Sequence, residues 1–330
     1  MNKVKARYFK TLENGDVRCL LCPHACLIKS NDFGLCKTRE NIDGTLYAPF
    51  YGKASSIAID PIEKKPLYHF YPGSSILSVG TVGCSFHCLF CQNYSISQYT
   101  DIHTEDINVK DLDLILKQKH INMIAFTYSE PLIWFETVLD FSKELKKINP
   151  DYKIVLVTNG YINIDPLNEL LPYVDAMNID IKSFNNSFYQ KYCQGTLEPV
   201  LNVIRIASKN THVELTTLVI PGLNDTEDEM EAITKFIASI NPDIPLHISR
   251  YYPCYKMSTA ATSEKTIFDL TRVAKKNIHY VYPGNVFNLD DSTTCECGNR
   301  LIIRKGFSSK IVGIKENKCT ECGKNIYGFF

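Results

Sequence analysis

The sequence predicts an α/β protein built on a parallel sheet that is either open or curled into a barrel. The first observation is a regular alternation, between about residues 74 and 286, of short runs rich in Ile, Val and Leu with longer amphipathic segments. Such runs are typical of strands in a parallel sheet that is covered on both faces. The second observation is the length of 330 residues with 45% hydrophobic and 22% charged residues, which fits one large domain with appendages and excludes wholesale disorder.

Seven strands and the helices between them are expected in this central block. The strands cover residues 76–81, 123–128, 154–158, 176–181, 213–220, 246–249 and 279–282. The clearest helix covers residues 224–240, where Asn224 and Glu227 could form a capping box. Its apolar side chains repeat on one face at Met230, Ile233, Phe236, Ile237 and Ile240. Because strand–helix units place functional groups at the carboxyl ends of the strands, we expect the site there.

The segments on either side of this block have a different composition. Residues 1–36 hold four cysteines among turn-forming residues, and residues 287–330 form a predicted β-rich ribbon with two cysteine knuckles. We therefore expect an N-terminal four-cysteine module with its lead-in over residues 1–73, a core over 74–286 and a C-terminal module over 287–330. No low-complexity linker separates them in the sequence, so both modules should pack on the core.

Charge and hydropathy argue against several function classes. The 36 basic and 36 acidic residues balance, so there is no overall electrostatic footprint for nucleic acid or an anionic membrane. The basic N-terminus is not followed by the apolar segment of a secretory signal. No apolar run reaches the roughly 18 residues of a membrane helix. We expect a cytoplasmic protein without a membrane partner.

The thirteen cysteines are the unusual feature of the composition. Eleven of them form three tight groups, which in a reducing compartment are typical of metal binding and not of disulfides. The groups are Cys19, Cys22, Cys26 and Cys36; Cys84, Cys88 and Cys91; and Cys295, Cys297, Cys319 and Cys322. The two single residues, Cys193 and Cys254, are expected to be small apolar residues in or near the core.

The central group lies in the loop after the first predicted strand. Cys84, Cys88 and Cys91 stand in the segment Cys-Ser-Phe-His-Cys-Leu-Phe-Cys, whose spacing lets three thiolates bind three corners of a [4Fe–4S] cluster. An electron-carrying cluster has four cysteine ligands. With three, one iron stays open, as a catalytic zinc site keeps an open position. The alternatives are zinc with a fourth ligand such as His87, or thiols without a metal.

This motif, in the first loop of an α/β barrel, resembles the radical S-adenosylmethionine (SAM) superfamily. The segment 83–93 resembles the pyruvate formate-lyase activating enzymes and, more closely, the AmmeMemoRadiSam-system radical SAM enzymes. The resemblance implies a partial (β/α) barrel and an open iron that chelates the methionine part of SAM. It further implies reductive cleavage of SAM to a 5′-deoxyadenosyl radical, which takes hydrogen from a substrate carbon. An external electron donor of the ferredoxin or flavodoxin type is also implied, whereas the substrate could be a small molecule or a protein.

Residues at other strand ends match the family's cofactor-binding segments. Glu130 stands where the family contacts the SAM amino group, and a helix N-terminal carboxylate is the alternative. In the family's counterpart of the segment Asp180-Ile-Lys182, the lysine meets the SAM carboxylate and the aspartate helps to hold a cation or the ribose; a mutual salt bridge is the alternative. The resemblance adds Phe90 against the adenine, Thr158 and Asn159 at the third strand end, and His247, Arg250 and Asn285 near the ribose and adenine. For His247 a structural role is the alternative.

The two flanking cysteine groups each offer four thiolates. The first group, Cys19 to Cys36, could close a tetrahedral zinc site or a fully ligated auxiliary [4Fe–4S] cluster. We favour structural zinc, because a short turn-rich module needs a metal to fold. The last group, Cys295 to Cys322, predicts a zinc ribbon whose first knuckle is one residue short. Because this gap strains the chelate loop, the alternatives are a weaker site or one that does not hold zinc. The local excess of basic residues in the ribbon predicts a solvated face, with binding of nucleic acid or an acidic partner as the alternative.

The sequence therefore predicts a radical SAM enzyme with an unidentified substrate. One alternative is an activase that forms a glycyl radical on a partner protein. The other is a zinc-stabilised binding protein without catalysis, which would contain zinc but no iron and would not bind SAM.

Overall fold

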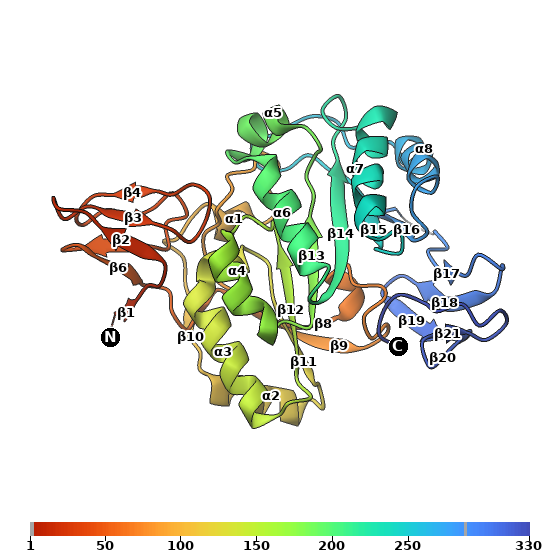
Figure 1. The fold of residues 1–330 in the computed structure, drawn as a ribbon, viewed down its shortest axis with the longest axis horizontal. Helices are drawn as coiled ribbons and strands as arrows, with labels where there is room; N and C mark the ends of the chain where they lie inside the picture. The colour runs from red at the N-terminus through yellow and green to blue at the C-terminus, as the bar shows by residue number, and fades with distance from the viewer. Residues whose placement is uncertain (1–2, 287–288) are drawn as a thin grey trace.

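The computed structural model describes residues 3–286 and 289–330. Its centre is an eight-stranded sheet (Figure 1). The strands are β8 (Ser56–Pro61), β9 (Ser75–Gly80), β11 (Met123–Phe126), β12 (Lys153–Thr158), β13 (Ala176–Asp180), β14 (His212–Val219), β15 (Leu246–Arg250) and β16 (Val281–Gly284). They lie in chain order from β8 at one edge to β16 at the other, and all neighbours from β9 onward are parallel. This sheet with its crossover helices is the predicted partial (β/α) barrel.

All seven predicted strands are present, with shifted ends. The last one begins at Val281 and not at His279, because the backbone NH of His279 bonds to the Pro242 carbonyl and its ring is held by Asp243, 2.6 Å from Nδ1 to Oδ1. The edge strand β8, which runs antiparallel to β9, falls in the segment that we had assigned to the lead-in.

Helices connect the parallel strands and cover the outer face of the sheet (Figure 1). They are α1 (Tyr94–Ser97), α2 (Val109–Gln118), α3 (Phe135–Ile148), α4 (Ile164–Leu170), α5 (Asn186–Phe188), α6 (Leu197–Ala207), α7 (Glu227–Ile240) and α8 (Glu264–Ala274). Shorter turns are η1 (Ile62–Lys64), η2 (Pro131–Trp134), η3 (Leu171–Tyr173) and the π-helical η4 (Tyr189–Cys193). None of the described helices is long and apolar enough to cross a membrane.

Helix α7 confirms the predicted apolar stripe but not the predicted cap. Four of the five stripe residues are buried, and Ile240 is partly buried against the same core. Thr226 and not Asn224 caps the helix, because its hydroxyl accepts the backbone NH of Glu229 at 3.2 Å. The Asn224 side chain instead accepts the NH of Ile220 and donates to the carbonyl of Lys182, so it ties together two loops at the carboxyl edge of the barrel.

The N-terminal module consists of two small sheets beside α3 and α4 (Figure 1). Their strands are β1 (Val4–Lys5), β2 (Phe9–Thr11), β3 (Val17–Cys19), β4 (Leu27–Ile28), β5 (Glu40–Ile42) and β6 (Thr45–Ala48), followed by the pair β7 (Lys53–Ala54) and β10 (Glu105–Asp106). Arg39 fastens the module to α3 through Glu136, with an Nη2–Oε2 distance of 2.7 Å and both side chains at most 3% exposed. Tyr8 adds a 2.7 Å hydrogen bond to Glu169 of α4.

The C-terminal module is a β-rich ribbon on the opposite side of the barrel (Figure 1). Its strands are β17 (Thr293–Thr294), β18 (Arg300–Lys305), β19 (Ser308–Ile311), β20 (Ile314–Lys315) and β21 (Lys318–Cys319). Arg304 lies over the ring of Tyr68 and donates to its carbonyl at 2.6 Å, which attaches the ribbon to the segment before β9. The first two residues of the expected module, 287 and 288, lie outside the described part of the chain.

The segment of residues 62–71 fills the inner face of the barrel at the amino ends of the strands. Its apolar side chains pack against Ile76, Met123 and Val155, which point to the face opposite the helices. Buried Glu214 of β14 accepts the backbone NH groups of Tyr68 and His69 at 2.9 and 2.7 Å. The base of the barrel is thus closed, and the carboxyl ends of the strands are left for a functional site.

Candidate active site

The central cysteines lie in the loop that follows the carboxyl end of β9. Cys88 is buried, whereas Cys84 and Cys91 are partly exposed. The loop backbone is held from two sides. The NH groups of His87 and Leu89 donate to the carbonyls of Cys193 and Tyr192, and the Leu89 carbonyl accepts the NH of Lys256 at 2.9 Å. Neighbouring segments therefore fix the loop that carries the three thiols.

Three of the predicted cofactor residues meet next to Cys84. The buried carboxylate of Glu130 accepts the Thr158 hydroxyl at 2.5 Å and the backbone NH of Asn159 at 2.8 Å. The Asn159 amide in turn lies 3.1 Å from the Ser85 hydroxyl and 3.5 Å from the Cys84 sulfur. Burial raises the pKa of Glu130 to about 7, although these hydrogen bonds oppose the shift. Glu130 is also the N-cap of η2, so the alternative role as a helix N-terminal carboxylate is present as well.

Asp180 and Lys182 form a charged pair on the side of Cys88. The Lys182 ammonium lies 2.7 Å from a carboxylate oxygen of Asp180, so the mutual salt bridge that we considered as an alternative is present. Burial opposes the charged form of Lys182, but Asp180 and Cys88 together raise its pKa well above the usual value. The structure thus keeps a cation beside the cysteine loop.

Phe90, Arg250 and Asn285 also lie at the carboxyl edge of the barrel. Phe90 is buried and its ring centroid is 5.9 Å from that of Phe188. The Asn285 amide donates to the carbonyl of Arg250 at 3.1 Å, which joins the ends of β15 and β16. The guanidinium of Arg250 is engaged by Glu264 at 3.1 Å.

His247 is placed elsewhere. It is the second residue of β15, and its Nε2 lies 2.7 Å from the buried carboxylate of Glu214, which also contacts His212. Its ring packs edge-on against Tyr68 at the closed base of the barrel. Although burial opposes it, these histidine contacts hold the pKa of Glu214 well below its usual range. This is the structural role that we considered as the alternative, and we leave His247 out of the candidate site.

The two single cysteines of the sequence, Cys193 and Cys254, lie next to the loop. Cys193 is fully buried, and its contact with Cys88 is the largest cause that raises the pKa of the Cys88 thiol, followed by burial. The Cys254 sulfur lies 3.5 Å from the carbonyl of Cys91. No spacing pattern links these single residues to the motif, because both approach it from loops distant in the sequence. Only the fold brings them there.

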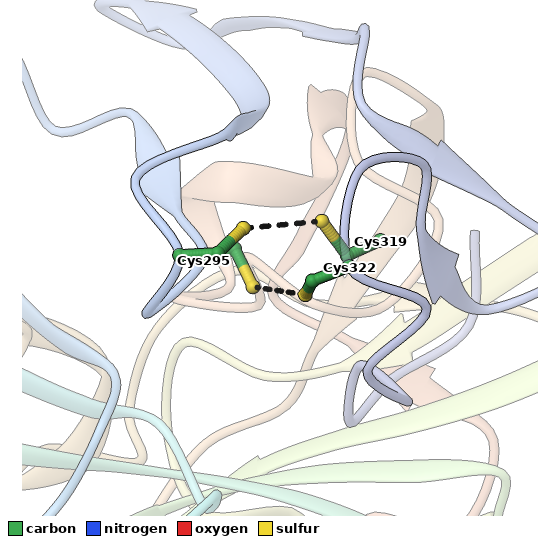
Figure 2. A group of neighbouring side chains, drawn as sticks. Cys295, Cys319 and Cys322 are labelled. Atoms are coloured by element: carbon green, nitrogen blue, oxygen red, sulfur yellow. Dashed lines mark hydrogen bonds between the residues drawn. The ribbon is translucent and has the colours of Figure 1, made fainter.

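The C-terminal cysteines converge on one point (Figure 2). Their four sulfurs all lie within 4.8 Å of one another, with 3.6 Å between Cys295 and Cys322 and 3.7 Å between Cys297 and Cys319. The backbone NH of Cys322 and the amide of Asn299 lower the pKa of Cys319 to about 6, which favours a thiolate. The predicted strain of the short knuckle does not keep Cys297 out of the group, and this group can hold a metal ion.

The N-terminal cysteines are also brought together, around one cavity. The cavity is lined by Cys19, Cys22, Cys26 and Cys36, and also by His24, Arg39 and Ile133 among others. His24 points toward the central loop, because its Nε2 lies 2.8 Å from the carbonyl of Ser85. The structure therefore places this group directly beside the central one.

Comparison with known proteins defines the class of this protein. The sequence profile of the Radical SAM superfamily matches residues 78–237, which include the cysteine loop and the strands up to β14. The chain is 40% identical, over 98% of both sequences, to an uncharacterized protein of Methanocaldococcus jannaschii. The chain therefore belongs to the radical SAM superfamily, whose members are enzymes that catalyse radical reactions.

Within the superfamily, the chain is related to the pyruvate formate-lyase activating enzymes. It is 24% identical to pyruvate formate-lyase 1-activating enzyme of Escherichia coli over 59% of this chain and 81% of that enzyme. A radical SAM methyltransferase from Sphaerobacter thermophilus shares the fold, with a TM-score of 0.52 over 70% of this chain and 71% of that one at 14% identity.

Proposed function

We propose that this protein reductively cleaves SAM at a [4Fe–4S] cluster held by Cys84, Cys88 and Cys91, and that the radical formed abstracts hydrogen from a substrate carbon. One arrangement carries the proposal. A carboxylate, Glu130, and a cation, Lys182, stand on two sides of a three-thiol loop at the carboxyl end of a parallel barrel. These are the groups that an amino acid chelated to the open iron would need.

The donor set fits such a cluster. Among the described residues, only the C-terminal group brings three or more metal-ligand atoms within 4.8 Å of one another, so the three central sulfurs are more widely spread. A single ion would draw them together, whereas a cubane places each thiolate on a separate iron. When bound, the cluster and SAM supply the electron transfer and the carbon radical.

The residues of the chain have separate tasks in this proposal. Glu130 accepts the amino group of SAM, and its own hydrogen bonds from Thr158 and Asn159 fix its orientation. Lys182 pairs with the carboxylate of SAM while Asp180 holds the ammonium in place. Phe90 offers a ring to the adenine. The backbone NH of Lys256 holds the cysteine loop through the Leu89 carbonyl, and exclusion of water at this edge would protect a reactive radical.

Two further parts complete the proposal. An external ferredoxin- or flavodoxin-type protein supplies the electron. The C-terminal group holds zinc, because a tetrahedral ion with bonds of about 2.3 Å places its sulfurs about 3.8 Å apart, close to the 3.6 and 3.7 Å between Cys295 and Cys322 and between Cys297 and Cys319. Free thiols in this number also require a reducing compartment, which supports work in the cytoplasm.

The test is anaerobic cleavage of SAM. Reconstituted protein with dithionite and SAM should release methionine and 5′-deoxyadenosine, and Cys88→Ala should abolish the release because two thiolates do not hold the cluster. Cys254→Ala is the control, since it removes a thiol near the loop, though a partly buried one, and no ligand. Undiminished cleavage by the Cys88 variant would disprove the assignment.

A second candidate function is the activation of a glycyl radical enzyme. The similarity to pyruvate formate-lyase 1-activating enzyme supports it. Incubation of the protein with SAM, a reductant and purified pyruvate formate-lyase should then produce a stable organic radical in the electron paramagnetic resonance (EPR) spectrum. SAM cleavage without such a signal would favour a different substrate.

A further inference from the structure

The four N-terminal cysteines are too widely spread for a single zinc ion. Their side chains line one cavity. Tetrahedral zinc would place all four sulfurs about 3.8 Å apart, as in the C-terminal group. In the described part of the chain, however, only that C-terminal group gathers three or more ligand atoms within 4.8 Å of one another. The N-terminal donors, like the central ones, are therefore not gathered as closely as a single zinc ion requires, and this differs from the structural zinc that we favoured from the sequence.

Arg39 gives a second, independent indication. It is 1% exposed and lines the same cavity. Its two Nη groups bind Glu136 at 3.0 and 2.7 Å, but its Nε is buried without a hydrogen-bond partner. A buried donor without a partner is costly. A sulfide or thiolate of an iron–sulfur cluster would accept this NH, and hydrogen bonds to sulfur are one way in which proteins set the potential of a cluster.

The N-terminal site also touches the central loop through the backbone. Gly83, directly before the first central cysteine, packs on the peptide of Cys36, since a Cβ at Gly83 would lie 2.4 Å from the Cys36 carbonyl oxygen. Nearby, Nε2 of His87 lies 3.2 Å from the carbonyl of Leu35. One ligand of the N-terminal group is therefore separated from the central ligands only by directly packed backbone.

We propose that Cys19, Cys22, Cys26 and Cys36 hold a second, fully ligated [4Fe–4S] cluster that relays electrons to the central one. A low-potential iron–sulfur or flavin protein gives one electron, which reduces the N-terminal cluster from its 2+ to its 1+ state. That electron then passes to the central cluster, and the N-terminal cluster returns to 2+ without a proton transfer. The presence of a [4Fe–4S] cluster at the N-terminal site does not depend on the proposed function. Its role as an electron relay does rest on the proposed function.

The first experiment counts metals in anaerobic protein. Two clusters and one zinc predict about eight irons and about one zinc per chain, whereas zinc at the N-terminal site predicts about four irons and about two zincs. The triple variant Cys84→Ala/Cys88→Ala/Cys91→Ala should keep about four irons and an EPR signal after reduction that SAM does not change. The inference would be overturned if the triple variant contained no iron and the unmodified protein contained only about four irons per chain.

A matched variant separates this inference from the proposed function. Cys22→Ala/Cys26→Ala should lose the N-terminal iron but keep the central cluster, whose EPR signal should still change on addition of SAM. If the EPR signal of the remaining cluster does not change on addition of SAM, the proposed function fails. The iron content of the unmodified protein and of the triple variant would still support the N-terminal cluster. If iron in this variant equals that of the unmodified protein, the N-terminal site holds none and the inference fails.

The relay is tested by the rate of reduction. In Cys22→Ala/Cys26→Ala, reduced ferredoxin should reduce the central cluster about tenfold more slowly or worse, measured by freeze-quench EPR, while dithionite reduces it at an unchanged rate. Equal rates with ferredoxin would refute the relay. Arg39→Lys keeps a cation for Glu136 but removes the Nε donor, so it should lower the potential of the N-terminal signal and leave that of the central signal in place.

Discussion

The pH dependence of SAM binding tests the assignment of Glu130. Burial raises the pKa of this carboxyl to about 7. About nine tenths of it is therefore ionised at pH 8 and about one tenth at pH 6. The ionised form is the better acceptor for the SAM amino group. We expect the contribution of Glu130 to binding to fall about tenfold between these pH values, which corresponds to about 1.4 kcal/mol.

The assay is anaerobic equilibrium dialysis of labelled SAM against the unmodified protein and Glu130→Gln. SAM itself also titrates near neutral pH, but this affects both proteins equally and cancels in the ratio of their dissociation constants. That ratio should be largest at pH 8 and approach one at pH 6. A ratio that does not change with pH would refute the reasoning, because Glu130 would then act only as the N-cap of η2.

The stability of the folded protein should depend on pH in the opposite direction to SAM binding. Since the folded state raises the pKa of Glu130 from 4.5 to about 7, the folded protein without SAM holds a proton that the unfolded chain releases. Its stability should therefore fall as the pH rises through this window, and Glu130→Gln should flatten that part of the profile. Thermal unfolding between these pH values, without SAM, measures the slope.

Three further predictions concern Arg39, Cys193 and Cys322. Arg39→Met leaves the carboxylate of Glu136 buried without its cation and should destabilise the protein by about 3–5 kcal/mol in denaturant unfolding, whereas Lys265→Met on the surface should cost less than about 0.5 kcal/mol. Cys193→Ser should keep the iron content and the SAM-induced EPR change, since this thiol is a neighbour and not a ligand; loss of iron would make it the fourth ligand. Cys322→Ser should lose the zinc and lower the melting temperature, and a full zinc content in this variant would contradict the ribbon site.

Much of the fold was predictable because its signals are local. Seven parallel strands buried on both faces leave apolar runs, and all seven runs form strands. Strand β8 was missed because it lies at the edge of the sheet, where apolar side chains are partly exposed. Ile57 and Ile59 are 38% and 43% exposed, so its burial does not resemble that of a covered strand. The cap of α7 was misplaced by two residues because Asn224 is used for long-range hydrogen bonds to the barrel loops.

The candidate site was predictable only where the spacing of residues in a sequence motif indicates their chemistry. The strand-end residues Glu130 and Asn159 lie beside Cys84 of the three-cysteine motif, and their cofactor roles remain predictions. His247 differs because its neighbour is Glu214 on the adjacent strand, and no local pattern reveals that pairing. Cys193 contacts Cys88 from the end of η4, a segment that lies far from the cysteine loop in the sequence. Contacts between distant segments are set by the packing and not by the local sequence.

The two cysteine modules occupy opposite flanks of the barrel (Figure 1), and this separation has a consequence for damage by oxygen. Arg304 and Tyr68 fasten the barrel floor to the flank for which we propose a redox-inert ion, while the flank with the unpartnered Arg39 NH lies beside the reactive loop. Exposure to air should therefore remove the colour of the clusters and the activity of the protein long before the barrel unfolds. Anaerobic repair with iron and sulfide should then restore the clusters on a barrel that has stayed folded.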